Sequence, residues 1–435
     1  MTYLRNYLLR PALAYLLLQM LRRLYRLAFS PNLLLRTLPN SLGERLAHAT
    51  PSLQHSYTPS SCVYYFGLLS TALYPAIRKL QFTYQPKYVR QTFQLPEFRN
   101  THQPSNLPWV ERDRHPEILT CCPEVVPPGE VSLDWAGAPE ERADAIYIVV
   151  PGLTGCSNES YIRCFVRYME INCPKSRVAC YNPRGRGGNP ITSDFLYSGG
   201  YTQDLRRVIQ HVHANIAGAR PIFLVGYSLG GNVVTKMIGE DGDRCLVRGA
   251  AVCSPPLDFL SMSNHLTTSW IGQLLDAFLV YSCNRELTSD PTNVDRHFFQ
   301  TIRRKRPTTM CELDHNVIAP MMELTSASHY YRLASGGQWL HKIRIPMLFV
   351  LPEDDPLVDG ERVRRDDFET NPCLVGVFTK YGGHSMDLPE AVEEGDRKSG
   401  SRNFFQSRSW FDKIVVEFTN AVLEEGGTTK ASVKD

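Results

Sequence analysis

The stretch that decides the fold is PIFLVGYSLGGNVVTKMIGE, residues 221–240. Residues 221–226 form an apolar run, which is typical of a buried strand in a parallel sheet. Residues 229–240 predict a helix. Between them, Gly226-Tyr227-Ser228-Leu229-Gly230 is a G-x-S-x-G pattern, whose two glycines leave room for neighbouring backbone in a tight turn. The stretch therefore predicts a strand, a sharp turn and a helix, with a serine at the tip of the turn.

Ser228 is a candidate nucleophile because of its place in this stretch. It lies at the carboxyl end of the predicted strand and at the amino end of the predicted helix, where the helix dipole favours developing negative charge. A serine hydroxyl is a weak nucleophile near neutral pH, so it needs a base, an acid that orients the base, and donors for an oxyanion. The alternative is an ordinary glycine-rich turn in which Ser228 only caps the helix.

The orienting acid should come after the serine and before a histidine in this arrangement. PMLFVL, residues 346–351, predicts a strand that runs into Pro352-Glu353-Asp354-Asp355-Pro356. An acid just past the end of a parallel strand can point into the same cleft as Ser228. We choose Asp355 as the acid, with Asp354 as the alternative, and either side chain could instead cap a loop.

The base is expected at His384, about thirty residues further along the chain. It follows a predicted strand, residues 373–378, and Gly382-Gly383, which permits a close approach of the backbone. Of the twelve histidines, it alone has the right order and setting relative to Ser228 and Asp355. A histidine with a surface or core position is the alternative.

An oxyanion hole needs two backbone N–H donors. Leu229, the residue after the serine, should supply the first. The second should come from the turn Pro151-Gly152-Leu153-Thr154-Gly155, which follows the predicted strand at residues 145–150. We choose Leu153 for this donor, with Thr154 as the alternative.

Strands and helices alternate along most of the chain, which predicts an α/β fold with a mostly parallel central sheet and helices on both faces. About ninety residues between residues 253 and 346 lack strand patterns, and they predict a helical cap insertion at about 259–340. We expect three parts: a lead-in at 1–61, the main domain at 62–425, and a disordered tail at 426–435. The predicted strands lie at 145–150, 177–181, 221–226, 248–253, 346–351 and 373–378, and the predicted helices at 161–171, 204–215, 229–240 and 270–281.

The first 43 residues differ in charge from the rest of the chain. They contain six arginines and no Asp, Glu or Lys. On a helix, residues 13–27 would place leucines on one face and arginines on the other, which suits a membrane interface or a mitochondrial targeting peptide. A helix packed on the main domain is the third possibility. We expect an intracellular, membrane-associated protein, with a mitochondrial location as the alternative.

Composition and missing motifs exclude several classes of function. Lys plus Arg is 47 and Asp plus Glu is 44, so the formal charge is 47 − 44 = +3, which gives no general attraction to nucleic acid. The sequence has no P-loop, no G-x-G-x-x-G after a strand, and no Cys/His spacing of a zinc site. We therefore expect no metal, no cofactor and no nucleic-acid partner.

Over residues 62–390 the chain resembles the YheT-type branch of the α/β-hydrolases, which are membrane-associated serine esterases and lipases. The resemblance implies the α/β-hydrolase fold, hydrolysis of lipid or medium-chain acyl esters, and a catalytic triad at Ser228, Asp355 and His384. Two alternatives are an acyltransferase that uses the same acyl-serine and a non-catalytic scaffold. The matching motifs are LDW at 133–135, PGLTG at 151–155, ESY at 159–161, NPRGRGG at 182–188, YTQDL at 201–205, GYSLGGN at 226–232, ELD at 312–314, EDDPLV at 353–358 and GGH at 382–384.

Overall fold

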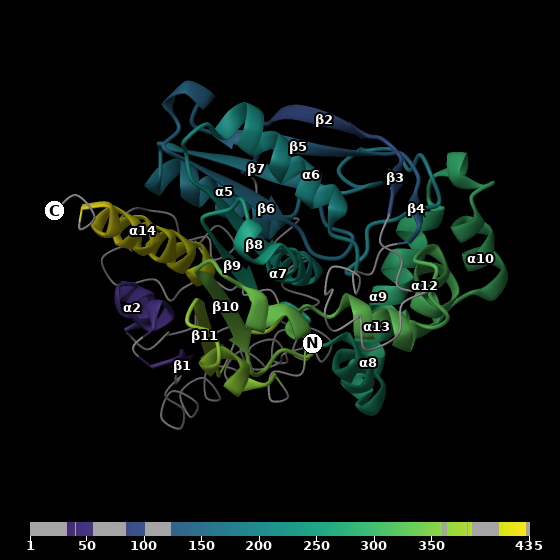
Figure 1. Cartoon of the computed structure of the whole chain (residues 1–435). Helices are drawn as coiled ribbons and strands as arrows, with labels where there is room; N and C mark the ends of the chain where they lie inside the picture. Colours follow the sequence, from purple (N-terminus) through teal and green to yellow (C-terminus); the bar gives the residue numbers. More distant parts are fainter. Residues whose placement is uncertain are drawn as a thin grey trace, which may run out of the picture.

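The computed structural model describes residues 33–39, 41–54, 84–100, 123–358, 363–380, 382–384 and 409–431. A mixed sheet forms the centre of this part of the chain (Figure 1). Its described strands, in spatial order, are β1 (Leu33–Arg36), β11 (Leu374–Thr379), β10 (Met347–Pro352), β9 (Gly249–Cys253), β8 (Ile222–Tyr227), β6 (Ala145–Val150), β7 (Ser176–Asn182), β5 (Gly129–Gly137) and β2 (Val89–Leu95). Strands β6 to β11 are parallel, and β1, β5 and β2 pair in antiparallel fashion at the edges. The predicted mostly parallel α/β sheet is confirmed.

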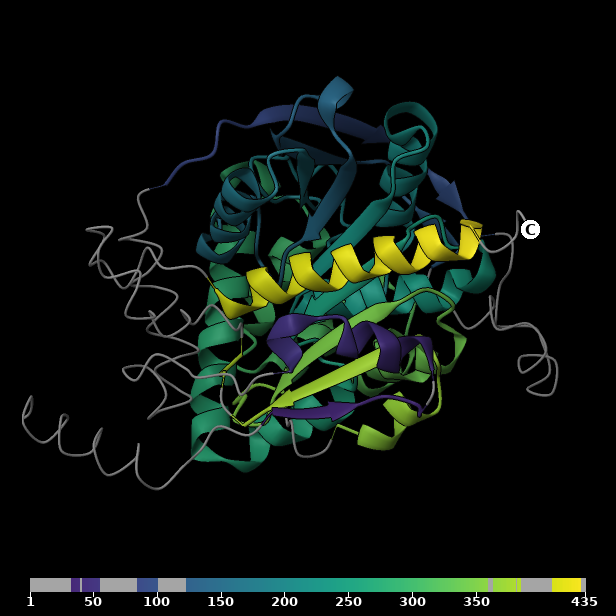
Figure 2. The same ribbon diagram turned by 90° about the vertical axis from the view of Figure 1, so that its left-hand side faces the viewer.

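Helices bury both faces of this sheet. One face is covered by α2 (Leu42–His48), α5 (Ser160–Asn172) and α14 (Trp410–Ala431), of which α2 and α14 lie in front of the sheet in Figure 2. The other face is covered by α6 (Gln203–Val212) and α7 (Leu229–Asp241). Every residue of β6, β8, β9, β10 and β11 is buried, which explains why these strands are continuous apolar runs in the sequence.

A helical cap follows β9 and lies beyond the carboxyl ends of the parallel strands (Figure 1). It has its own apolar cluster, which reaches down to Leu229 at the start of α7. Side chains cap several of its helices; for example, Ser269 accepts a hydrogen bond from the N–H of Gly272. The cap helices are α8 (Phe259–Thr268), α9 (Trp270–Thr288), α10 (His297–Lys305), α11 (Met310–Leu313), α12 (Ala319–Met321) and α13 (Ala327–Ala334), and a second, small sheet pairs β3 (Phe98–Arg99) with β4 (Val125–Val126).

Two domain boundaries differ from the sequence-based expectation. Strand β1 pairs with β11, and α2 packs into the main core, so the main domain begins before residue 62. A four-residue edge strand has too short a pattern to be recognised without its partner. Helix α14 continues to Ala431, past the predicted start of a disordered tail at residue 426. The predicted amphipathic helix at residues 13–27 and the charged segment at 390–408 lie outside the described residues.

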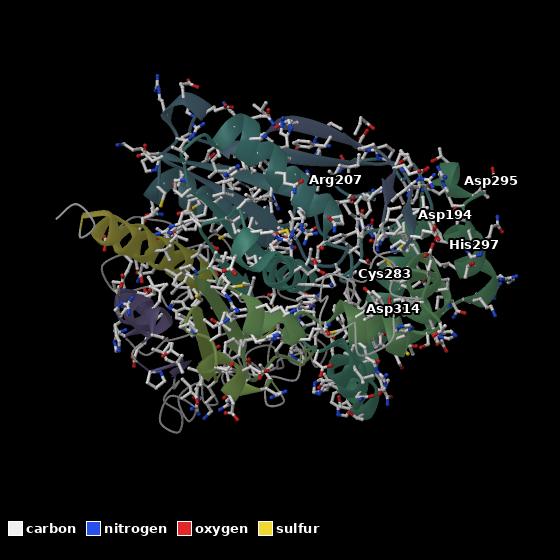
Figure 3. The ribbon with its side chains drawn as sticks, in the orientation of Figure 1. Asp194, Arg207, Cys283, Asp295, His297 and Asp314 are labelled. Carbon is white, nitrogen blue, oxygen red and sulfur yellow. The ribbon has the colours of Figure 1, made fainter. Side chains whose placement is uncertain are left out.

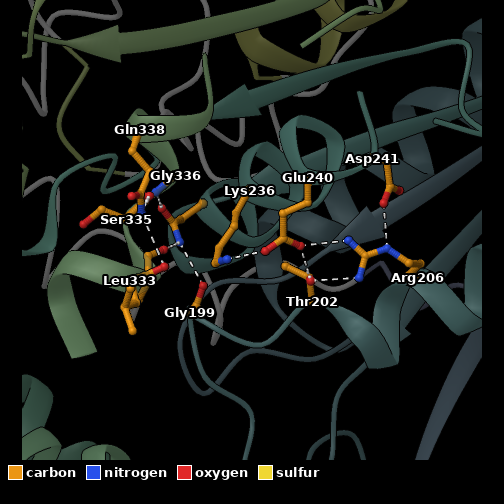
Figure 4. A network of polar contacts seen from close by, with 12 residues as sticks. Gly199, Thr202, Arg206, Lys236, Glu240, Asp241, Leu333, Ser335, Gly336 and Gln338 are labelled. Carbon is orange, nitrogen blue, oxygen red and sulfur yellow. Dashed lines mark hydrogen bonds and ion pairs between the residues drawn. The ribbon is translucent and has the colours of Figure 1, made fainter. Parts of the chain in front are cut away.

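A buried network of charged groups fixes the helix that follows Ser228 (Figure 4). Glu240 on α7 forms ion pairs with Lys236 and with Arg206 of α6, and Arg206 also contacts Asp241 at 2.7 Å. Burial alone would raise the pKa of Glu240, but Lys236 and Arg206 together hold this pKa below its ordinary value. Because Lys236 is fully buried, removing its carboxylate partner would leave an uncompensated charge in the core.

One amide side chain on the same helix joins α7 to the cap. The Nδ2 of Asn232 donates to the carbonyl oxygens of Gly199 and Ala334, and its Oδ1 accepts from the N–H of Gly336 at 2.7 Å. Ala334 ends α13, the last cap helix. The Asn232 side chain therefore ties the start of α7 to the point where the chain returns from the cap.

Candidate active site

Ser228 occupies a strained turn between β8 and α7. Its φ is +49°, in the left-handed region, which costs a residue with a side chain on the order of 1–3 kcal/mol. Hydrogen bonds hold the turn: the N–H of Ser228 donates to the carbonyl of Cys253 at 2.9 Å, and its carbonyl accepts from the N–H of Asn232 at 3.1 Å. The predicted strand–turn–helix around the serine is therefore present.

The two glycines of the pattern are required by close backbone contacts. A Cβ at Gly226 would lie 2.7 Å from the Cα of Gly231, and a Cβ at Gly230 would lie 2.3 Å from the carbonyl oxygen of Pro151. Neither contact can be relieved by rotating a side chain, because the opposing atoms belong to backbone. The turn thus packs directly against the loop after β6.

A Gly230→Ala substitution should lower the free energy of unfolding by about 3 kcal/mol, because the new methyl group must displace backbone at Pro151. The control is Gly218→Ala, where φ is +59° and an added Cβ would meet no atom within 4 Å. That variant should lose about 1 kcal/mol from the backbone conformation alone. Urea unfolding of both variants checks the difference, and equal losses would contradict the steric argument.

Three side chains that are distant in sequence meet at the carboxyl edge of the sheet. The Nε2 of His384 lies 2.7 Å from the Oγ of Ser228. The Nδ1 of His384 lies 2.9 Å from Oδ2 and 3.1 Å from Oδ1 of Asp355. Asp355 is buried, and its Oδ1 also accepts the N–H groups of Leu357 and Val358, which fix the carboxylate. The structure therefore brings together the three residues chosen from the sequence.

The neighbouring acid, Asp354, makes a different contact. Its Oδ1 accepts a hydrogen bond from the N–H of Gly383 at 2.9 Å, one residue before the histidine. Burial raises the pKa of Asp354 to about 6, and the adjacent Asp355 charge adds to this. Asp354 thus supports the backbone of the histidine loop, whereas Asp355 contacts the imidazole.

Both predicted oxyanion donors border the same pocket as Ser228. Leu229 is the first residue of α7, and Leu153 lies in a turn closed by the N–H of Gly155 and the carbonyl of Gly152 at 3.1 Å. Across the part of the chain that the structure describes, neither leucine N–H donates to a backbone carbonyl. The N–H of Gly152, in contrast, is taken by the Tyr161 hydroxyl at 3.1 Å. The choice of Leu229 and Leu153 stays a prediction.

A pocket of about 270 Å³ extends from Ser228 and His384 into the cap. Most of its wall is apolar and comes from α8, α9 and the residues around α11. Such a wall suits a hydrocarbon chain and gives water few partners. Its apolar residues include Leu196, Leu229, Phe259, Met262, Leu275, Phe278, Leu279, Leu287, Met310, Leu313, Ile318 and Leu357.

An acidic side chain borders this apolar pocket. Asp314 follows α11 in the cap, and its Oδ2 accepts a hydrogen bond from the Tyr331 hydroxyl at 2.8 Å. Figure 3 shows Asp314 and Cys283 among the cap helices. Burial, with a smaller contribution from the charge of Asp276, raises the pKa of Asp314 to about 7. Sequence analysis gave Asp314 no chemical role, although it lies in the ELD motif at 312–314 and beside the apolar residues Val317 and Ile318.

The buried acid should make stability depend on pH. An unfolded Asp314 ionises near pH 4, whereas the folded one keeps its proton until about pH 7. Stability is therefore lost as the pH rises between these values, by about 1.4 kcal/mol for each unit by which the pKa is raised. Asp314→Asn keeps an acceptor for Tyr331 and should be more stable than wild type at pH 8, with little gain at pH 4.

Urea unfolding at both pH values tests this prediction. Asp243→Asn, at an exposed position, is the control and should not change the difference between pH 4 and pH 8. If Asp314→Asn and wild type lose stability in parallel over this range, the buried carboxyl is not the cause.

Comparison with known proteins identifies the family of this chain. A family model described as serine aminopeptidase, S33, matches residues 142–369, which include the turn at Ser228 and Asp355. The chain belongs to this family. It is thus a member of the α/β-hydrolase superfamily, and the predicted resemblance to its serine esterases and lipases is confirmed.

Curated relatives agree with this assignment. A monoacylglycerol lipase of Saccharomyces cerevisiae is 30% identical over 252 residues, which cover 56% of this chain and 55% of the relative. The match therefore spans about half the length of that lipase. An abhydrolase domain-containing protein of Dictyostelium discoideum is 25% identical over 81% of this chain and 84% of its own, and phospholipase ABHD3 of Mus musculus is 26% identical over 68% and 70%.

Proposed function

We propose that this protein is a serine hydrolase that cleaves carboxylic esters, with Ser228, His384 and Asp355 as its catalytic triad. The observation that carries the proposal is the continuous set of contacts from the Ser228 hydroxyl through the imidazole to the buried carboxylate. These contacts lie at one end of an apolar pocket. A serine with such partners is a nucleophile, whereas a structural serine needs no aligned base.

In this mechanism the Nε2 of His384 takes the hydroxyl proton as the Ser228 Oγ attacks the acyl carbonyl. Asp355 holds the other ring nitrogen and stabilises the imidazolium that forms. The N–H groups of Leu229 and Leu153 receive the negative charge on the carbonyl oxygen. His384 then protonates the departing alcohol, and water, activated by the same imidazole, releases the acid from the acyl-serine.

The proposed substrates are acyl esters with an apolar chain, such as acylglycerols, phospholipids or medium-chain esters. The apolar wall of the pocket supports this choice, because it would bind a hydrocarbon chain and exclude a strongly polar one. The relatives named monoacylglycerol lipase and phospholipase support the same class. No metal or cofactor takes part in the proposed reaction.

A fluorophosphonate probe tests the function directly. The wild-type protein should be labelled on Ser228 and should hydrolyse acyl esters in a chain-length series, and the probe should abolish this activity. A non-catalytic scaffold would not be labelled at this position. The same assay with ethanol or glycerol present detects acyl transfer, because a transferase would form a new ester rather than the free acid.

We also propose that the protein works inside the cell at a membrane surface. The arginine- and leucine-rich segment at residues 1–43 supports this proposal. Within the described ranges, no helix combines the length and the apolar character that a bilayer crossing requires. Fusing residues 1–43 to a fluorescent protein tests the location: diffuse fluorescence would refute membrane association, and mitochondrial fluorescence would favour targeting.

A further inference from the structure

The proposed substrate pocket is lined by four side chains of the arginine, acidic or histidine type. They are Arg184, Arg186, Asp314 and His384. His384 belongs to the proposed triad, and the carboxyl group of Asp314 is bound by the hydroxyl of Tyr331. The two arginines lie in the loop after β7 and differ sharply in their contacts.

Arg184 is committed to the fold. Its Nε and Nη2 donate to the two carboxylate oxygens of Asp204 at 2.6 and 3.0 Å, and its Nη1 donates to two backbone carbonyl oxygens. Arg186, in contrast, makes one hydrogen bond, from its Nη1 to Oε2 of Glu286 at 2.7 Å. Among the residues that the structure describes, the Nε and Nη2 of Arg186 donate to no acceptor. Since a guanidinium has five N–H donors, most of those on Arg186 can serve a ligand.

The guanidinium of Arg186 lies between the pocket interior and the protein surface. The Arg186 side chain is only 12% exposed, whereas its partner Glu286 on α9 is 53% exposed. Burial raises the pKa of the Cys283 thiol to about 12, and the nearby positive charge of Arg186 opposes this rise. The guanidinium is therefore close to Cys283, which lines the pocket. Because an ion pair with an exposed carboxylate contributes little to stability, an incoming anion can displace Glu286 at a small cost.

Main-chain contacts hold the loop that carries Arg186. The N–H of Arg186 donates to the carbonyl of Pro183 at 3.0 Å, and its carbonyl accepts the N–H of Asn189 at 3.0 Å. The Nδ2 of Asn189 donates to the carbonyls of Asn182 and Pro183. None of these contacts uses the guanidinium. The loop is thus ordered before a ligand binds, which lowers the entropic cost of binding, and a substitution of the Arg186 side chain should leave the turn folded.

We propose that Arg186 binds an anionic oxygen group, a phosphate or a carboxylate, on the alcohol part of the ester, so that the enzyme prefers esters with a charged headgroup over neutral ones. The paired N–H groups of a guanidinium match two oxygens of either anion. The position near the surface lets the charged end stay close to water while the acyl chain fills the apolar wall. This inference rests on the proposed function, because it names the substrate class of the same site.

The kinetic experiment compares esters that differ only in charge. Octanoylglycerol phosphate is paired with octanoylglycerol, and octanoyl glycolate with octanoyl glycolamide; the measured quantity is the kcat/KM of the charged ester divided by that of the neutral one. Wild type should favour the charged ester of at least one pair, and that pair identifies the anion. Arg186→Gln should lower this ratio at least tenfold. Arg304→Gln, at an exposed position of the cap, is the control and should leave the ratio unchanged.

A second variant distinguishes ligand binding from a structural role of the ion pair. Glu286→Gln removes the competing carboxylate and leaves Arg186 to the substrate, so the ratio should rise by about threefold. If the ion pair only stabilised the fold, the two variants would change the ratio in the same direction or leave it unchanged. Either result, or a wild type that favours the neutral ester of both pairs, would overturn the inference.

Binding to the Ser228→Ala protein separates this inference from the proposed function. Isothermal titration calorimetry should show that octyl phosphate binds this variant at least tenfold more tightly than octanol, and that the added Arg186→Gln change removes the difference. If wild type hydrolyses no ester but this binding is found, the hydrolase function is wrong and the anion site stands. If wild type hydrolyses esters but neither binding nor the ratio depends on Arg186, the anion site is wrong and the function stands.

Discussion

The Ser228→Ala variant should hydrolyse acyl esters with a kcat reduced by about 10⁶-fold. The reason is that water would have to attack the ester without forming an acyl-enzyme, while His384 would lack the hydroxyl that lies 2.7 Å from its Nε2. Some catalysis should remain, because the oxyanion donors and the pocket still act on bound substrate. The measurement is kcat for a medium-chain ester by steady-state kinetics.

The kcat of Ser228→Ala can be compared with that of the wild type only if the two proteins are equally stable. Alanine at position 228 keeps the backbone hydrogen bonds to Cys253 and Asn232, since both use main-chain atoms. Its urea unfolding curve should therefore overlap that of the wild type. If a folded Ser228→Ala protein hydrolyses esters at the wild-type rate, the proposed nucleophile is wrong.

Asp355→Asn should reduce kcat by about 10⁴-fold. An asparagine can donate its amide hydrogens to the Nδ1 of His384, which favours the tautomer that cannot accept the serine proton. The carboxylate would also be missing when the imidazolium forms. Oδ1 of the new side chain can still accept the N–H groups of Leu357 and Val358, so the loop should stay folded.

The adjacent acid provides a matched control for this variant. Asp354→Asn keeps an oxygen that can accept the N–H of Gly383, so this hydrogen bond is weakened and not lost. Such a loss amounts to about 1 kcal/mol, so kcat should fall by less than about tenfold. Equal losses in the two variants would mean that Asp355 acts by holding the loop and not by orienting the histidine.

The sequence predicted the central part of the fold because the signals there are local. Buried parallel strands read as continuous apolar runs, and β6, β8 and β10 lie within a residue of the predicted ranges. The edge strand β1 was missed, because its four residues acquire strand geometry only by pairing with β11, more than three hundred residues away. A pairing over that distance leaves no periodic trace in the sequence.

The candidate site also has one part that could be predicted from local sequence and another that could not. The turn at Ser228 could be predicted because its signals lie in one short segment: a strand, a turn and a helix in succession, with a glycine on each side of the serine. Asp354 and Asp355 have nearly the same local context, and the sequence could only rank them. The direction in which β10 ends in the folded sheet determines that the Asp355 carboxylate reaches the imidazole while Asp354 contacts Gly383.

The sequence by itself determined the type of fold, the position of the strained turn and the order of serine, acid and histidine, because each depends on neighbouring residues or on chain order. The tertiary structure alone decided that residues 228, 355 and 384 meet, that Asp314 is buried beside the pocket, and that Trp270 and Tyr281 of α9 are exposed. These features depend on which surfaces the packed helices and strands cover. Burial and the distances between distant residues arise only from that packing. In an unfolded chain all of these side chains would be exposed to water and far from one another.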